Sequence, residues 1–220
     1  MERKEWCPGL KEDAHDAALE LAWENLARTE LKRAVGNAGA GLVDGKVVVR
    51  TFGRDCVVDP STKSVAIRDK ELSPLASILV LHYLAGAADV TPTGKWVSYR
   101  QVPGGSVYYP AFKQRVIDQI GSLFHSRPQL LLSAMDVLEA KKLDFGEASV
   151  QIDVFPKLPV AVIIWKGDDE VRGTANVLFD ETAPSFMATE DLASVGSFVL
   201  NQLIKARELM LREVNNRNTV

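Results

Sequence analysis

The spacing of apolar residues predicts helices in five parts of the chain. In the first part, Ala14, Ala18 and related positions recur at three- and four-residue intervals with charges between them. This pattern is typical of an amphipathic helix, which we expect over residues 11–33. Ser73 favours the N-cap of a helix and a following proline favours its first position. The later helices are expected to begin at Pro74, Pro110, Pro128 and Thr189.

Alternating or continuous apolar runs predict strands in two groups, a meander and a hairpin extended by a third strand. The expected strands cover residues 42–52, 54–58, 64–68, 148–155, 159–165 and 173–179. Gly53 and residues 59–62 supply the turns of the meander, and Gly45 is placed inside its first strand. Because helices separate the two antiparallel groups, the predicted fold class is α+β.

We expect one domain over residues 1–220, in which an antiparallel β-meander and a β-hairpin pack with about five helices. The chain shows no linker long enough to mark a domain boundary. Roughly ten residues at the N-terminus and five at the C-terminus are expected to be flexible.

Composition narrows the classes of function. The net charge is −3, so a broad surface for nucleic acid or for an anionic membrane is not expected. The two cysteines, Cys7 and Cys56, are too few for a disulfide framework. The first residues lack the apolar core of a signal peptide, and the longest apolar run, at residues 78–88, is too short to cross a bilayer. We therefore expect a cytoplasmic protein that contacts neither nucleic acid nor membrane.

His82 is the residue that points most directly to a ligand. It lies within the apolar run SPLASILVLHYLAGA, residues 73–87, where an ionisable group needs a partner. One interpretation is a metal ligand, since imidazole is a common axial ligand of haem iron and can serve cobalt similarly. Ala85 and Gly86 would then leave room for a flat macrocycle. The other interpretation is a core residue bound to a backbone carbonyl or to a nearby carboxylate.

A glycine turn, Gly104-Gly105, gives a second candidate site. Its amides, together with a helix N-terminus, could hold a carboxylate or phosphate, with charge from Arg100 and Lys113. Tyr108 and Tyr109 are expected just before that helix. The alternative is a tight turn between a short strand and a helix, since a full phosphate-loop pattern is missing. The residues that we predict to bind a cofactor are His82, Tyr83, Tyr109 and Arg100.

Other residues that could carry chemistry have simpler interpretations. Cys56 is expected to be buried and inert. A second axial ligand beside His82 could come from Met135, His125, Cys56 or a tyrosine. The acidic residues 168–170 are expected to form a solvated turn, because the spacing of a calcium loop is absent.

Several segments resemble an uncharacterised domain family of anaerobic bacteria and archaea. They are LVLHYLAGA at residues 79–87, GKWVSYRQVPGGSVYYPAF at residues 94–112 and FPKLPVAVIIWKGDDEVRGTANVLFD at residues 155–180. Members of that family are sometimes fused to an iron–sulfur domain like the one on corrinoid iron–sulfur proteins. The resemblance implies a setting in anaerobic one-carbon or tetrapyrrole-linked metabolism. This chain has no cysteine cluster, so the fused cofactor does not carry over, and no catalytic residue is transferred.

Three functions follow as hypotheses. The first is a non-catalytic protein that binds a tetrapyrrole, haem or corrinoid, with His82 on the metal. The second is an enzyme that acts on a small anionic metabolite near Gly104-Gly105. The third is an interaction module for a redox or methyl-transfer partner, such as an iron–sulfur or corrinoid protein.

Overall fold

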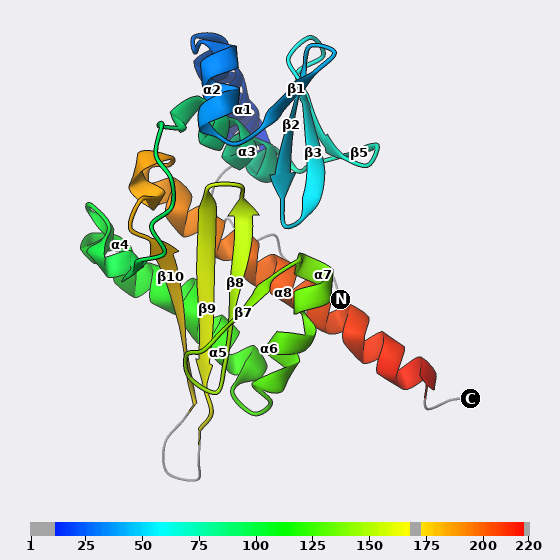
Figure 1. Ribbon diagram of the computed structural model, residues 1–220, viewed down its shortest axis with the longest axis vertical. Helices are drawn as coiled ribbons and strands as arrows, with labels where there is room; N and C mark the ends of the chain where they lie inside the picture. The colour runs from blue at the N-terminus through cyan, green and yellow to red at the C-terminus, as the bar shows by residue number, and fades with distance from the viewer. Residues whose placement is uncertain (1–11, 168–172, 218–220) are drawn as a thin grey trace.

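The computed structural model describes residues 12–167 and 173–217, and it contains two antiparallel sheets of five strands each (Figure 1). The strand order is β1-β2-β3-β4-β5 in the first sheet and β6-β10-β9-β8-β7 in the second. In the sequence, one helix separates the strands of the first sheet from those of the second, and further helices lie between the first strand of the second sheet and its other four. Helices also pack beside the strands in space. The predicted α+β class is therefore confirmed. Cys7 and the acidic turn at residues 168–170 lie outside the described residues.

The first sheet is an antiparallel meander, as predicted, but it has more strands than the sequence suggested. Its strands are β1 (Gly41–Val43), β2 (Lys46–Thr51), β3 (Arg54–Asp59), β4 (Ser64–Ile67) and β5 (Lys70–Glu71). The single strand expected over residues 42–52 is wrong, because the chain reverses at Asp44-Gly45. Both residues have positive φ, 49° and 79°, as a two-residue hairpin turn requires. The Asp-Gly pair was the signal for this turn.

The second sheet contains the predicted hairpin at its centre. Its strands are β6 (Trp96–Ser98), β7 (Lys141–Leu143), β8 (Ala148–Phe155), β9 (Leu158–Trp165) and β10 (Thr174–Asp180). β9 is buried along nearly its whole length, which explains its continuous apolar run. The edge strands β6 and β7 were not predicted. Each has only three residues, too few for a recognisable pattern of apolar residues. β6 is defined by its pairing with β10, and β7 by its pairing with β8.

The single N-terminal helix expected over residues 11–33 is two helices. They are α1 (Glu12–Ala27) and α2 (Leu31–Asn37). The first helix ends at Ala27, and the hydroxyl of Thr29 just beyond it donates a hydrogen bond to the carbonyl of Leu26, 2.6 Å away. This local bond offers the backbone an alternative to the helical ladder. α3 (Pro74–Gly86) begins where predicted, although the Ser73 side chain makes no capping hydrogen bond.

The helix expected to begin at Pro110 begins five residues earlier. It comprises α4 (Gly105–Phe112), a π-helical turn at Lys113–Ile117, and α5 (Asp118–Phe124). Gly104 precedes it in the left-handed conformation, with φ at 73°, which favours glycine. Pro110 is accommodated within the helix. The start was misplaced because Pro110 occupies an interior position, where the preference of proline for the first turn does not apply.

The remaining helices complete the core. The helix expected from Pro128 is divided into α6 (Gln129–Ser133) and α7 (Met135–Leu138), and the last helix is α8 (Thr189–Arg217). In Figure 1, α8 crosses the whole molecule diagonally. It packs against α3, α4, α6 and α7. Thr189 was expected to cap α8, but its hydroxyl donates instead to the carbonyl of Pro103.

Candidate functional site

His82 of α3 is held by a carboxylate from the far end of the sequence. Its Nδ1 lies 3.0 Å from both carboxylate oxygens of Asp191, in the first turn of α8. The side chain of His82 is 32% exposed and that of Asp191 20% exposed. The expected carboxylate partner of His82 is therefore present, but His82 is partly exposed and is not a core residue. Asp191 was expected in this turn because of the helix dipole, but its pairing with His82 was not predicted.

This contact makes the imidazole more basic. The hydrogen bond to Asp191 raises the pKa of His82 above its ordinary value, and the negative charge of Asp191 adds to the rise, while partial burial opposes it. When the ring is neutral, Nδ1–H donates to Asp191 and Nε2 keeps its lone pair. Within the described residues, Nδ1 is the only ring atom with a hydrogen-bond partner. Nε2 is the atom available to a ligand.

The room expected beside His82 is partly taken. A Cβ built at Gly86 would lie 2.4 Å from the carbonyl oxygen of Phe186. The missing side chain of Gly86 therefore admits the backbone that leads into α8, not a macrocycle, and this part of the expectation is wrong. The glycine serves close packing between α3 and the segment before α8.

Tyr83, the next residue, belongs to the core. It is fully buried, and its hydroxyl donates to the carbonyl of Ala38 at 2.7 Å and accepts from the amide of Lys157 at 3.0 Å. Burial raises the pKa of Tyr83 above its ordinary value. Because both hydrogen-bonding directions of the hydroxyl are used, we leave Tyr83 out of the candidate site.

Arg100 and Tyr109, which we predicted to lie in the same site, contact each other in the structure. The guanidinium carbon of Arg100 lies 4.4 Å from the centroid of the Tyr109 ring, a cation–π contact. Tyr109 and Tyr108 lie inside α4, not before a helix as predicted. Lys113 forms an ion pair with Asp118. The positive charges expected to hold an anion at the glycine turn thus already have partners.

The turn itself is explained by packing. A Cβ at Gly105 would lie 1.9 Å from the carbonyl oxygen of Tyr99, so only glycine allows this approach. The tight-turn interpretation of Gly104-Gly105 accounts for both glycines.

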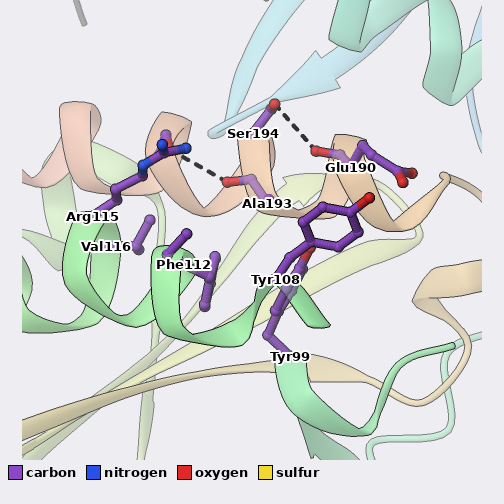
Figure 2. A pocket seen from close by; sticks show the side chains of 10 residues that line it. Tyr99, Tyr108, Phe112, Arg115, Val116, Glu190, Ala193 and Ser194 are labelled. Atoms are coloured by element: carbon purple, nitrogen blue, oxygen red, sulfur yellow. Dashed lines mark hydrogen bonds between the residues drawn. The ribbon is translucent and has the colours of Figure 1, made fainter. Parts of the chain in front are cut away.

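A cavity of about 220 Å³ lies between α4, the π-helical turn and α8 (Figure 2). Tyr99, Tyr108, Arg115 and Glu190 give it a polar side, and Phe112 lies on its apolar side. Burial raises the pKa of Tyr99 to about 12, helped by the negative charge of Glu190. Sequence reasoning missed this cavity, because its walls come from segments roughly ninety residues apart that share no local motif.

Glu190 and Asp191 are neighbours with different surroundings. Glu190 lines the cavity beside α4, whereas Asp191 contacts His82 on α3. Successive helical residues point about 100° apart, so the first turn of α8 supplies one residue to the cavity and the next residue to the contact with His82.

Two of the expected second ligands, Cys56 and His125, have other surroundings. Cys56 is buried, and burial raises the pKa of its thiol to about 12, so it is not a ready thiolate. His125 lines a different cavity, beside Gly173 and α5. Across residues 12–167 and 173–217, no group of three or more His, Cys, Asp and Glu side chains could hold a metal ion.

The fold and site define an α+β protein with two five-stranded antiparallel sheets and a carboxylate-oriented histidine. Residues 30–202 match the family described as domain of unknown function DUF3786, and the chain belongs to that family. A comparison with curated proteins and one with solved structures gave no match. No helix among the described residues is long and apolar enough to cross a membrane.

Proposed function

We propose that the protein is a non-catalytic cofactor-binding protein in which Nε2 of His82 is an axial ligand to the metal of a tetrapyrrole, haem or corrinoid. The observation that carries the proposal is the contact between His82 Nδ1 and the Asp191 carboxylate, at 3.0 Å to each oxygen.

The donor chemistry of this pair suits a metal ligand. Histidines that bind metals usually donate their second ring N–H to a carboxylate, which fixes the tautomer, orients the ring and increases ligand basicity. A tetrapyrrole supplies four ligands of its own and needs one from the protein. One imidazole held in a fixed orientation is therefore a sufficient protein ligand for such a cofactor.

The exposure of His82 indicates how a cofactor would reach it. The side chain is 32% exposed, and the space beside Gly86 is filled by Phe186. These facts favour a macrocycle that approaches from solvent over one enclosed between helices. Such an open site suits the exchange of a cofactor with a partner. By the family resemblance, that partner is an iron–sulfur or corrinoid protein in the cytoplasm of an anaerobe.

Visible spectroscopy tests the proposal. The full chain is titrated with haemin and, separately, with a cobalamin, and the Soret or corrin bands are recorded. We expect a saturable band shift in the parent protein that is lost in His82→Ala and kept in His125→Ala. Asp191→Asn keeps an acceptor near Nδ1 but removes its charge, so it should bind about 10-fold or more weakly.

Three results would overturn the proposal. One is no shift with either cofactor in the parent protein. Another is a shift that His82→Ala leaves intact. A shift lost in His125→Ala but not in His82→Ala would move the ligand to the other histidine. Circular dichroism of each variant shows whether it is folded, so that a lost band can be assigned to the missing ligand.

A further inference from the structure

A second and larger cavity, of about 480 Å³, opens beside the first sheet. Its walls come from the β2–β3 turn, the β4–β5 hairpin, the start of α3 and the middle of α8. The volume lies in the range of small-molecule sites, which is roughly 300–1,000 Å³. The cavity shares no residue with the His82–Asp191 pair or with the cavity of Figure 2.

The cavity has a strong excess of positive charge in a chain that is negative overall. Four cationic side chains line it, and Glu71 is the one carboxylate among its lining residues. The four are Arg54, Arg68, Lys70 and Lys205. None of them forms an ion pair with another residue in the described ranges. Like charges repel, so gathering four of them without partners favours an anion among them.

A buried hydroxyl in the same wall points to a missing hydrogen-bond partner. Thr51 ends β2 on the buried face of that strand and is 1% exposed. Its Oγ1 is enclosed and makes no hydrogen bond with the part of the chain that the structure describes. A buried polar group without a partner is costly and uncommon in folded proteins. A ligand oxygen in the cavity would supply that partner.

The start of α3 adds a third favourable element. Ser73 and Ala76 line the cavity, and α3 has thirteen residues, so its positive dipole end faces this region. The hydroxyl of Ser73 makes no capping hydrogen bond. It therefore remains available to an oxygen of the ligand.

Most of the rest of the wall is apolar, with Gln202 as a further polar residue. Phe52 and Phe198 meet edge to face, with ring centroids 4.8 Å apart, and both line the cavity. An aromatic pair of this kind offers a surface for a flat or aliphatic group, which an inorganic ion would not use.

We propose that this cavity binds a small organic phosphate. The phosphate group lies among the four cations, near Thr51 and the start of α3, and the organic portion packs against Phe52 and Phe198. Arginine pairs with phosphate through two parallel hydrogen bonds, as Arg54 and Arg68 can do here. A phosphate carries up to two negative charges and three acceptor oxygens, whereas a carboxylate has one charge and two oxygens, so four cations favour the phosphate.

Isothermal titration calorimetry of the full chain with phenyl phosphate tests the site. Inorganic phosphate, benzoate and benzyl alcohol are run beside it, to separate the charge from the ring. We expect phenyl phosphate to bind most tightly, with an affinity that falls as salt rises. The double variant Arg54→Gln, Lys205→Gln should weaken binding about 10-fold or more, because charge-assisted hydrogen bonds are lost. Lys142→Gln, an exposed lysine on β7 outside the cavity, is the matched control and should bind as the parent does.

Thr51→Val gives a second, independent readout. It removes the unpartnered hydroxyl and keeps the shape of the side chain. We expect the unliganded variant to be at least as thermally stable as the parent, but to bind phenyl phosphate more weakly. A loss of function through misfolding would instead lower the stability.

Several outcomes would overturn the proposal. No heat from phenyl phosphate up to about 5 mM would do so, since that range detects millimolar dissociation constants. If the Arg54/Lys205 double variant bound phenyl phosphate as tightly as the parent, the cations would have no role in binding. Benzoate or benzyl alcohol binding as tightly as phenyl phosphate would remove the preference for phosphate. If inorganic phosphate bound as tightly as phenyl phosphate, the organic portion of the ligand would contribute nothing to binding.

Discussion

The ring of Tyr83 stacks on the ring of Phe155, with centroids 4.3 Å apart and planes 13° from parallel. This contact joins α3 to β8, and so connects the N-terminal half of the chain to the second sheet. The Tyr83 hydroxyl extends the connection, because it bridges the carbonyl of Ala38 and the amide of Lys157.

Tyr83→Phe tests the bridge. The substitution keeps the stacked ring but leaves the Ala38 carbonyl and the Lys157 amide without their partner in a buried place. We expect the free energy of unfolding to fall by about 1–3 kcal/mol. Urea unfolding followed by circular dichroism measures it. A change within error would mean that water replaces the hydroxyl at both groups.

Gly86→Ala tests the packing between α3 and the segment before α8. Alanine normally favours a helix over glycine by about 1 kcal/mol. Here the added Cβ would lie 2.4 Å from the Phe186 carbonyl oxygen, so the variant should instead be destabilised. Ala85→Gly is the complementary control, which should cost only the intrinsic helix preference. Thermal unfolding distinguishes the two directions, and a stabilised Gly86→Ala would contradict the observed packing.

Asp180 supports the loop that precedes β6, and its effect depends on pH. Burial alone would raise the pKa of Asp180, but hydrogen bonds from Thr182, Thr93 and Gly94 outweigh it and hold the pKa below the ordinary value. A lowered folded-state pKa gives stability that is present above the unfolded-state pKa and is lost as the pH falls through the folded-state value.

Asp180→Asn should therefore destabilise the protein by about 2–4 kcal/mol at pH 6, because its amide cannot accept all four hydrogen bonds. The difference from the parent should narrow at about pH 3, because the stability that a lowered folded-state pKa supplies is lost as the pH falls below the unfolded-state value, about 3.9. Urea unfolding at the two pH values measures the narrowing. A difference that stays constant would show that the charge of Asp180 is not what stabilises the loop.

The pair of His82 and Asp191 should have the opposite dependence on pH. The folded-state pKa of His82 is raised, so its contribution is fully present below the unfolded-state value, near 6.5. It is lost as the pH rises through the folded-state value. Asp191→Asn should lower the free energy of unfolding by about 1 kcal/mol at pH 5.5 and by less at pH 9. Denaturant titrations at both pH values test the sign, which a larger loss at pH 9 would contradict.

The same pair sets the pH dependence of the proposed cofactor binding. Nε2 must be unprotonated to bind a metal, so the affinity should fall as the pH drops below the raised pKa of His82, by about tenfold for each pH unit. In Asp191→Asn the midpoint should move to lower pH, because the charge that raised the pKa is gone. Haemin titrations across pH 5 to 9 measure both midpoints, and identical midpoints would contradict the role of Asp191.

Much of the fold could be predicted where the signal is local. The start of α3 at Ser73-Pro74 and the β8–β9 hairpin followed from neighbouring residues, and the structure has them at the predicted places within a residue or two. The misplaced start of α4 and the divided N-terminal helix show the limit of such signals. At Thr29 a single side-chain hydrogen bond accompanies the break in the expected helix. At α4 the helix begins at Gly105, after the left-handed Gly104, and Pro110 lies in its interior.

The sequence by itself determined the α+β class, the main strands and the need of His82 for a partner, because periodicity and desolvation act on neighbouring residues. Only the tertiary structure decided which partner that is. Asp191 lies 109 residues from His82, and the crossing of α3 and α8 brings them together. The cluster of cations beside Thr51 arises in the same way. Its members come from separate elements, and their spacing in the sequence does not indicate that they lie close together in space.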